Sequence, residues 1–231
     1  MKNINDIAFI IQARLSSQRV PKKMIRDFAG TSLFEIGLNK LVNSKVAPNS
    51  NIYASVCDPE LVNIAQKYPV NIHERSQESA NGEDDLCTIF DWHDKLNCKY
   101  YVMLSACTPL LKQETIDDFF TTFVNTDSDG LFAVAKNRSF VWNSKHEMIT
   151  ARPDAKMNTK HIEPVYLPAH CLYGGRIDKI KKGIHMGTFQ KKNDPELYVI
   201  EEEKECLDID YEWQFIAAEA LYKYEKGNDN A

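Results

Sequence analysis

Residues 7–23 read IAFIIQARLSSQRVPKK, an unbroken apolar run followed at once by a loop rich in cations and hydroxyls. A continuous apolar run of this length is typical of a central strand covered on both faces. Ligands of open parallel sheets bind beyond the carboxyl ends of the strands. The stretch therefore predicts a sheet with two buried faces, and it places the basic loop where a ligand would lie.

Beyond this stretch, strand-length apolar runs alternate with helical patterns, which is the signature of repeated βαβ units. Strands are expected at 51–56, 70–73, 100–104, 131–135, 165–173 and 198–200, and helices at 33–42, 59–68, 82–96, 113–124 and 211–224. Thr31 and Ser32 are expected to cap the first helix and Asp58 the second, and Trp213 is expected to anchor the last helix in the core. The pattern predicts an α/β fold of three layers around a mainly parallel, Rossmann-like sheet, in a single domain over residues 1–231.

The alternation stops between Lys136 and Pro168. This segment has prolines, many polar residues and no clean period, which argues against another βα unit. We expect an arm or inserted hairpin at about 136–168.

The composition excludes several classes of protein. The chain has 28 Lys+Arg against 33 Asp+Glu, a net charge of −5, so it is not a general binder of nucleic acid or other polyanions. Its first apolar run is too short for a signal peptide, and no stretch approaches the ~18 apolar residues of a membrane span. The six cysteines show neither metal-finger spacing nor a disulfide framework. We expect a soluble, cytoplasmic protein with reduced thiols and no membrane insertion.

The loop after the first strand has the chemistry of a triphosphate site. Arg14 and Arg19 can each bind phosphate oxygens through two parallel hydrogen bonds, and Ser16 and Ser17 can donate hydroxyls. Lys23 can place a point charge on a leaving pyrophosphate. Composition alone leaves a solvated basic loop as an equal alternative, because neither a P-loop nor a dinucleotide glycine fingerprint is present.

A second polar segment lies near the C-terminus, where residues 207–212 read LDIDYE. Asp208 and Asp210 stand at i and i+2, so in extended chain their carboxylates point to the same side. Together they can hold one hard cation whose remaining ligands are phosphate oxygens and water. The alternative is that both residues cap the helix expected from Tyr211, although capping by Asp210 is compatible with a metal bound through Asp208.

The basic loop resembles the AR-x-x-S-x-R-x-P-x-K signature of the cytidylyltransferases that activate sugar acids. These are the CMP-acylneuraminate and CMP-KDO synthetases and the related spore-coat polysaccharide cytidylyltransferases. The signature falls here on Arg14, Ser17, Arg19, Pro21 and Lys23. The resemblance implies a fold of the nucleotide-diphospho-sugar transferase type. It also implies a CTP site made by Gln12, Ala13, Arg14, Ser17, Arg19, Lys23 and Arg75. For Arg75 alone, a surface arginine paired with Glu74 or Glu78 stays open.

Three further stretches extend the resemblance to this family. Residues 207–212 resemble its D-x-D segment, which implies Mg²⁺ on Asp208 and Asp210. Residues 104–111, LSACTPLL, resemble its LLQPTSPLR stretch, and residues 158–173 resemble its T-Q-D-L-x-P-V-Y…F-Y stretch, without the family's Asn-Gly pair. From these stretches we expect Ser105, Thr108 and His170 to contact the acceptor, as in the acylneuraminate branch.

The resemblance implies that the protein transfers CMP from CTP to an acylneuraminate-like 2-keto sugar acid and releases pyrophosphate, for surface glycan biosynthesis. Arg14, Lys23 and Asp210 would be the catalytic residues, and the arm would form a homodimer. Two alternatives stay open. One is cytidylyl transfer to another small acid, such as a phosphonate, and the other is a non-catalytic nucleotide-binding module.

Overall fold

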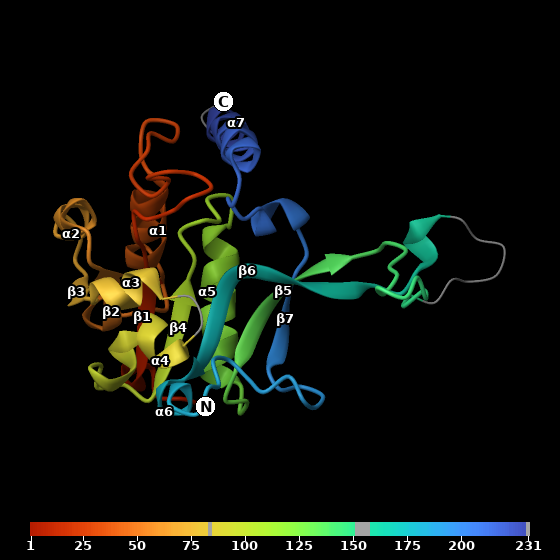
Figure 1. Cartoon of the computed structure of the whole chain (residues 1–231), viewed down its shortest axis with the longest axis horizontal. Helices are drawn as coiled ribbons and strands as arrows, with labels where there is room; N and C mark the ends of the chain where they lie inside the picture. The colour runs from red at the N-terminus through yellow and green to blue at the C-terminus, as the bar shows by residue number, and fades with distance from the viewer. Residues whose placement is uncertain (83–84, 151–157, 230–231) are drawn as a thin grey trace.

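The computed structural model describes residues 1–82, 85–150 and 158–229, and its strands form one seven-stranded sheet (Figure 1). Across the sheet the order is β3 (Asn71–Glu74), β2 (Ile52–Val56), β1 (Ile7–Gln12), β4 (Tyr100–Leu104), β6 (Val165–Arg176), β5 (Leu131–Asn137) and β7 (Glu196–Ile200). Among these described strands only β6 is antiparallel to its neighbours. The prediction of a mainly parallel sheet is confirmed.

Helices cover both faces of the sheet. They are α1 (Leu33–Val42), α2 (Pro59–Ala65), α3 (Gln77–Asn81), α4 (Leu86–Ile89), α5 (Gln113–Asn125), α6 (Ile177–Ile180) and α7 (Glu212–Asp229), with short 3₁₀ helices η1 (Ile4–Asp6), η2 (Asn49–Asn51), η3 (Asp91–Asp94), η4 (Thr159–His161) and η5 (Glu203–Cys206). Phe9 of β1 belongs to the core under α1 and α5, whereas Ile10 belongs to a second core under α4, η3 and α6. The three-layer prediction is therefore confirmed, because alternate residues of β1 are buried on opposite faces.

The first long helix begins as its sequence predicts. The Ser32 hydroxyl accepts the Glu35 N–H at 3.3 Å and donates to the Glu35 carboxylate at 2.7 Å, a reciprocal cap. Phe34, Leu38 and Leu41 are buried on the face that this cap aims at β1. The cap thereby fixes where the basic loop must rejoin the sheet.

The helix predicted at 82–96 is wrong. The described part of this segment forms only α4 and η3, which are separated at Phe90 by a non-helical residue with φ −109° and ψ 53°. Phe90 and Trp92 are both buried in the same core, 5.4 Å apart between ring centroids. Residues two apart do not share a face of an α-helix, so burying both rings requires the helix to break.

Trp213 does not anchor the last helix, contrary to expectation. Its side chain is 64% exposed, and Phe215 is buried instead, packing edge-on against Phe28 at 5.2 Å. Ala218 and Tyr222 continue the same face of α7 at the helical spacing. Because Trp213 is two positions from Phe215, it points away from this face.

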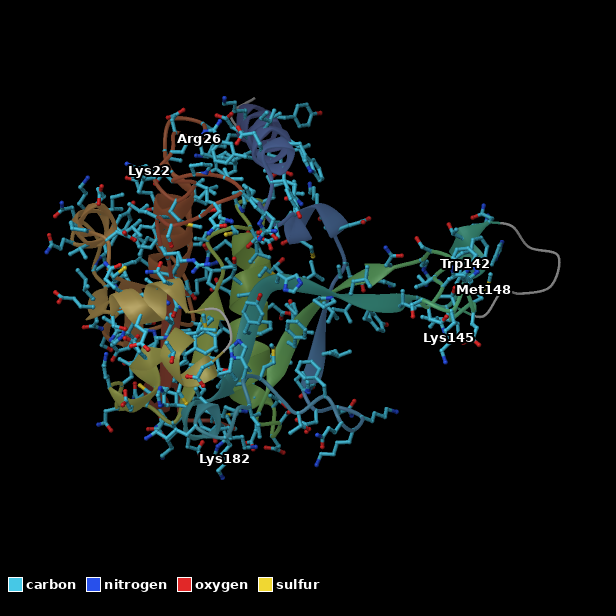
Figure 2. All side chains as sticks on the ribbon, in the orientation of Figure 1. Lys22, Arg26, Trp142, Lys145, Met148 and Lys182 are labelled. Carbon is cyan, nitrogen blue, oxygen red and sulfur yellow. The ribbon has the colours of Figure 1, made fainter. Side chains whose placement is uncertain are left out.

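The arm predicted at about 136–168 projects from the body of the molecule (Figure 1). In its described part the chain doubles back, because the Ile149 N–H donates to the Val141 carbonyl at 2.7 Å and Trp142 bridges Met148 (Figure 2). Arg138 ties the base of the arm to the Ile162 carbonyl at 2.5 Å. Residues 151–157, which belong to the predicted arm, lie outside the described chain.

The described helices include none that is long and apolar enough to cross a membrane. All six cysteines are free thiols, as expected from their scattered positions.

A buried histidine on the α6 side of the sheet makes the stability of the fold depend on pH. The Tyr101 hydroxyl lies 2.5 Å from His185 Nδ1 and donates to the His185 carbonyl at 2.6 Å, and the two rings stack. Burial lowers the pKa of His185 to about 4 from 6.5. Between about pH 6.5 and 4, the unfolded chain therefore binds a proton at this histidine that the folded chain does not bind. The free energy of unfolding is highest above about pH 6.5 and falls as the pH drops towards 4.

We predict that the free energy of unfolding falls by about 1–2 kcal/mol between about pH 7 and pH 5 because of His185. Chemical denaturation at several pH values measures this slope. His185→Asn should unfold more easily at neutral pH but show a flatter slope, whereas His146→Asn, at an exposed position in the arm, should keep the wild-type slope. An unchanged slope in His185→Asn would refute the assignment.

Candidate functional site

A cavity of about 640 Å³ lies at the carboxyl ends of β1 and its neighbours, where the first strand predicts a ligand site. Its lining residues are Gln12, Ala13, Arg14, Ser16, Ser17, Gln18, Arg19, Lys23, Met24, Arg75, Asn81, Gly82, Ile89, Cys107 and Asp210. Every residue expected to bind CTP is among them. The structure thus brings the whole predicted nucleotide set to one cavity.

The basic loop is positioned by contacts with the neighbouring strands. The Ala13 N–H donates to the Ser55 carbonyl at 3.1 Å, which continues the pairing of β1 with β2 for one residue. Two residues further along the loop, the Leu15 N–H donates to Asp58 Oδ2 at 2.9 Å. Asp58 precedes α2 as predicted, but its carboxylate makes no cap bond and holds the loop instead.

Gln12 and Arg75 form one wall of the cavity around a single carbonyl. The Ile89 oxygen accepts Gln12 Nε2 at 3.3 Å and Arg75 Nη2 at 3.2 Å, and Trp92 Nε1 donates to Gln12 Oε1 at 3.0 Å. Arg75 is only 6% exposed and also donates to the Ser79 carbonyl at 2.5 Å. The alternative of a surface arginine paired with Glu74 or Glu78 is therefore wrong.

Arg14 is held in place by a backbone carbonyl of α3. Its guanidinium donates to the Ala80 carbonyl at 2.7 Å, at the C-terminal end of α3. The arginine uses one donor there, and a guanidinium has five, so others remain to meet a ligand's phosphate. Arg14 can therefore hold its position before a ligand arrives.

The acidic segment meets the basic loop, although the two are far apart in sequence. Arg19 Nη2 donates to Asp210 Oδ1 at 2.9 Å, and Lys23 Nζ lies 3.8 Å from the same oxygen. Lys23 is 11% exposed and also donates to the Ile209 carbonyl at 2.5 Å. Asp210 thus lines the cavity together with Arg19 and Lys23, whereas Asp208 is not among the lining residues.

Asp208 and Asp210 flank a buried residue in a stretch without helix or strand structure. Ile209 between them is fully buried, and its N–H donates to the Cys107 carbonyl at 2.9 Å. The first amides before α7, those of Asp210 and Tyr211, both donate to Gln214 Oε1 at 2.8 Å. Capping is therefore done by Gln214, which leaves the Asp210 carboxylate on the cavity.

The acidic pair fits a Mg²⁺ ion that arrives with its substrate. Within the described residues, no group of three or more His, Cys, Asp and Glu side chains could hold a metal. Mg²⁺ in nucleotide sites typically takes one or two carboxylates and completes its octahedron with phosphate oxygens and water. Burial, and after it the charge of Asp210, raise the pKa of Asp208.

The residues expected to contact the acceptor lie outside the cavity wall. Thr108 is 2% exposed, and its hydroxyl donates to the Ser105 carbonyl at 3.2 Å, so its side chain supports the loop from within. Ser105 Oγ accepts the Cys107 N–H at 3.2 Å. His170 is exposed on β6, and its charge reaches Asp208. The structure therefore brings His170, but not the Thr108 hydroxyl, towards the acidic pair.

Sequence reasoning missed part of the site. Asn81 and Gly82 line the cavity from the end of α3, a helix that the pattern did not predict. Its signal is Ser76, whose hydroxyl accepts the Ser79 N–H at 2.9 Å, together with the Asn-Gly pair that ends it.

Comparison with known proteins identifies relatives over nearly the whole chain. The sequence profile of a family described as "Cytidylyltransferase" matches residues 8–222. A pseudaminic acid cytidylyltransferase of Campylobacter jejuni subsp. jejuni serotype O:23/36 is 24% identical over 237 residues, covering 96% of this chain and 97% of that protein. A second enzyme of this name, from serotype O:2, is 25% identical over 193 residues, covering 76% of this chain and 78% of its own.

Solved structures share the fold at low identity. A CMP:2-keto-3-deoxy-manno-octonic acid synthetase complexed with CTP superposes with a TM-score of 0.63 at 12% identity, covering 95% of this chain and 99% of that one. A 4-diphosphocytidyl-2C-methyl-D-erythritol synthase from Anaerococcus prevotii gives 0.64 at 15% identity, with coverages of 94% and 96%. At such identities the likeness establishes the fold.

We predict that Asp58→Ala raises the KM for CTP about tenfold, because the carboxylate that fixes the Leu15 amide is lost and hydrogen bonds to charged groups contribute about 1.5–3 kcal/mol. Steady-state kinetics with CTP as the varied substrate measures the change. Asp58→Asn keeps an acceptor oxygen and should stay within about threefold of wild type. A wild-type KM in Asp58→Ala would show that Asp58 does not position the loop.

Proposed function

Since the chain belongs to the cytidylyltransferase family, we propose that it transfers CMP from CTP to an acylneuraminate-like 2-keto sugar acid. The observation that carries this proposal is the meeting of Arg19, Lys23 and Asp210 on one wall of a cavity at the carboxyl edge of the sheet. The choice of acceptor is supported by the pseudaminic acid cytidylyltransferases that the chain resembles over most of its length. Surface glycan biosynthesis in the cytoplasm is the setting that this reaction implies.

The reaction has one bond made and one bond broken. A hydroxyl of the acceptor attacks the α-phosphorus of CTP in line, the bond between the α-phosphorus and the bridging oxygen breaks, and pyrophosphate leaves. The hydroxyl proton passes to solvent. Such phosphoryl chemistry needs little covalent help from the protein, so positioning and charge supply most of the rate.

The cations of the basic loop would hold the phosphates. Arg14 is anchored at Ala80 and Arg19 stands 54% exposed at the mouth, so both guanidinium groups can reach phosphate oxygens. Lys23 is nearly buried between the two patches, where its charge would stabilise the leaving pyrophosphate. The nucleoside would bind against the wall made by Gln12 and Arg75.

Asp208 and Asp210 would hold the Mg²⁺ ion. When bound, the ion would neutralise phosphate charge and lower the pKa of the attacking hydroxyl. In the free protein Arg19 and Lys23 compensate the Asp210 charge. These same cations would turn towards the phosphates once a divalent ion takes their place at the carboxylate.

Asp210→Asn should lower turnover by about 10²–10³-fold, because one charge that acts in the transition state is removed. Pyrophosphate release is measured with CTP, Mg²⁺ and a panel of pseudaminic acid, N-acetylneuraminic acid, 2-keto-3-deoxy-manno-octonic acid and a phosphonate. Wild type should turn over a 2-keto sugar acid. Asp210→Asn should keep the wild-type melting temperature, so that its loss is chemical.

The same panel separates the competing functions. If the phosphonate is the one acceptor of the panel that supports turnover, the acceptor belongs to another class of small acid. Binding of CTP without pyrophosphate release on any acceptor would indicate a nucleotide-binding module. Full activity of Asp210→Asn with Mg²⁺ would show that the Asp210 carboxylate does not hold the metal ion.

The arm is proposed to form a homodimer. Trp142 projects away from the body and is 53% exposed (Figure 2). Two further apolar side chains of the arm are exposed, Ile149 at 60% and Leu167 at 46%. Exposed apolar surface that is concentrated on a projecting hairpin is typical of a protein–protein interface. A second copy of the chain is the partner that the sugar-acid cytidylyltransferase resemblance implies.

Light scattering at assay concentrations should give the mass of a dimer. The double change Trp142→Asp and Ile149→Asp should give a monomer, because two charges would be buried at the interface. Trp213→Asp changes a tryptophan that is equally exposed on α7 and should leave the dimer intact. A monomeric wild type would contradict the proposal.

A further inference from the structure

The strand β6 bulges in the middle, and its backbone is strained there. It pairs with β5 up to Pro168, opposite Val134, and again from Tyr173, opposite Phe132, while its second half also pairs with β4 from Leu172, opposite Leu104. Between these points the register with β5 shifts, so that β6 has extra residues. His170 lies in this bulge with φ +51°, a left-handed conformation that costs every residue except glycine.

Other described residues share this conformation, but none of them lies in a strand. Lys22, Ala29, His146, Phe189 and Asn193 have positive φ in turns and loops, whereas His170 is within β6. The residues on either side of it, Ala169 and Cys171, are 2% and 0% exposed. The core therefore fixes the chain on both sides of His170 and imposes the strain at that point.

The fold itself gains little from the imidazole. The His170 side chain is exposed, and the contact recorded for it, with the Tyr173 hydroxyl, is long at 3.5 Å. A glycine would adopt this backbone without strain. Strain that persists at an exposed position without a packing role is characteristic of functional sites.

The position of His170 indicates what it would bind. The carbonyl of the next residue, Cys171, accepts the Ser105 N–H at 2.8 Å, which places the bulge beside the end of β4. His170 is close enough for its charge to act on Asp208, yet it is not part of the cavity wall that holds the phosphate-binding cations. The Cys107 carbonyl, two residues after Ser105, accepts the N–H of Ile209 at 2.9 Å, so the bulge and the acidic pair contact the same short loop.

We propose that His170 is a specificity-determining residue that donates a hydrogen bond to the carboxylate of the sugar acid. This inference rests on the proposed function. In the ring form of a 2-keto sugar acid, the attacking hydroxyl and the carboxylate sit on the same carbon. A hydroxyl that approaches the metal carboxylates from the β6 side therefore brings the acid group to the imidazole.

The test compares kinetics with thermal stability for His170→Gly. Removing the strain should raise the melting temperature by about 2–4 °C. Losing a hydrogen bond to a charged group should raise the KM for the sugar acid about 10- to 100-fold, with the KM for CTP unchanged. Asparagine tolerates the left-handed backbone and keeps a neutral donor. The melting temperature of His170→Asn and its KM for the sugar acid should therefore lie between those of wild type and His170→Gly.

Two controls isolate the roles of strain and of the acid group. Ala29→Gly relieves the same kind of strain at φ +54° in a turn outside the cavity wall, and it should raise the melting temperature with both KM values unchanged. The carboxamide analogue of the acceptor should bind wild type and His170→Gly equally weakly, as measured by its inhibition of the forward reaction.

The outcomes separate this inference from the proposed function. If wild type releases pyrophosphate with a sugar acid and His170→Gly has the same KM for it, the inference falls and the function stands. If wild type accepts no sugar acid at all, both fall together. A rise in the KM for CTP equal to that for the acid would also overturn the inference, because it would place His170 in a general structural role.

Discussion

The site depends on a charge interaction between two segments that are nearly the whole chain apart. Arg19 and Asp210 are separated by 191 positions and meet at 2.9 Å, and Lys23 bonds the carbonyl between the two acids. Both members of the Arg19–Asp210 pair are more than a third exposed, and pairs of this kind contribute little to stability. The pairing therefore matters for placement, because it brings the cations of the basic loop to a carboxylate at the other end of the chain.

That placement does not depend on the pair alone, because the chain that follows the basic loop is fixed on α7. Phe28 packs edge-on against Phe215, the Ala29 N–H donates to Glu219 at 2.9 Å, and Arg26 lies 2.7 Å from Glu212 beside the helix (Figure 2). These contacts would persist when Arg19 leaves Asp210 for a phosphate. The cavity can thus exchange one ionic partner for another while its walls stay in place.

Sequence predicted what is local or periodic, and it failed where distant packing decides. The apolar run of β1 and the Ser32 cap both act through the nearest residues, and both were predicted correctly. The helix expected at 82–96 does not form as one element because Phe90 and Trp92 are both buried in a core with Tyr101. The local sequence pattern does not indicate that Tyr101 is their partner. The same holds for Asp58, whose sequence reads as a cap but whose carboxylate is taken by the Leu15 amide.

The nucleotide side and the acceptor side of the site follow different physical constraints. Phosphate binding needs fixed charges at fixed spacing, so its residues are concentrated in one continuous loop that a sequence pattern can describe. The proposed acceptor side lies at the bulge of β6, whose geometry comes from a register shift against β5 and one strained residue, His170. A register shift is invisible in residue types, because it depends on which strands lie on either side. A cytidylyltransferase can therefore keep a recognisable nucleotide loop while its choice of acid is set by backbone geometry that only the folded sheet reveals.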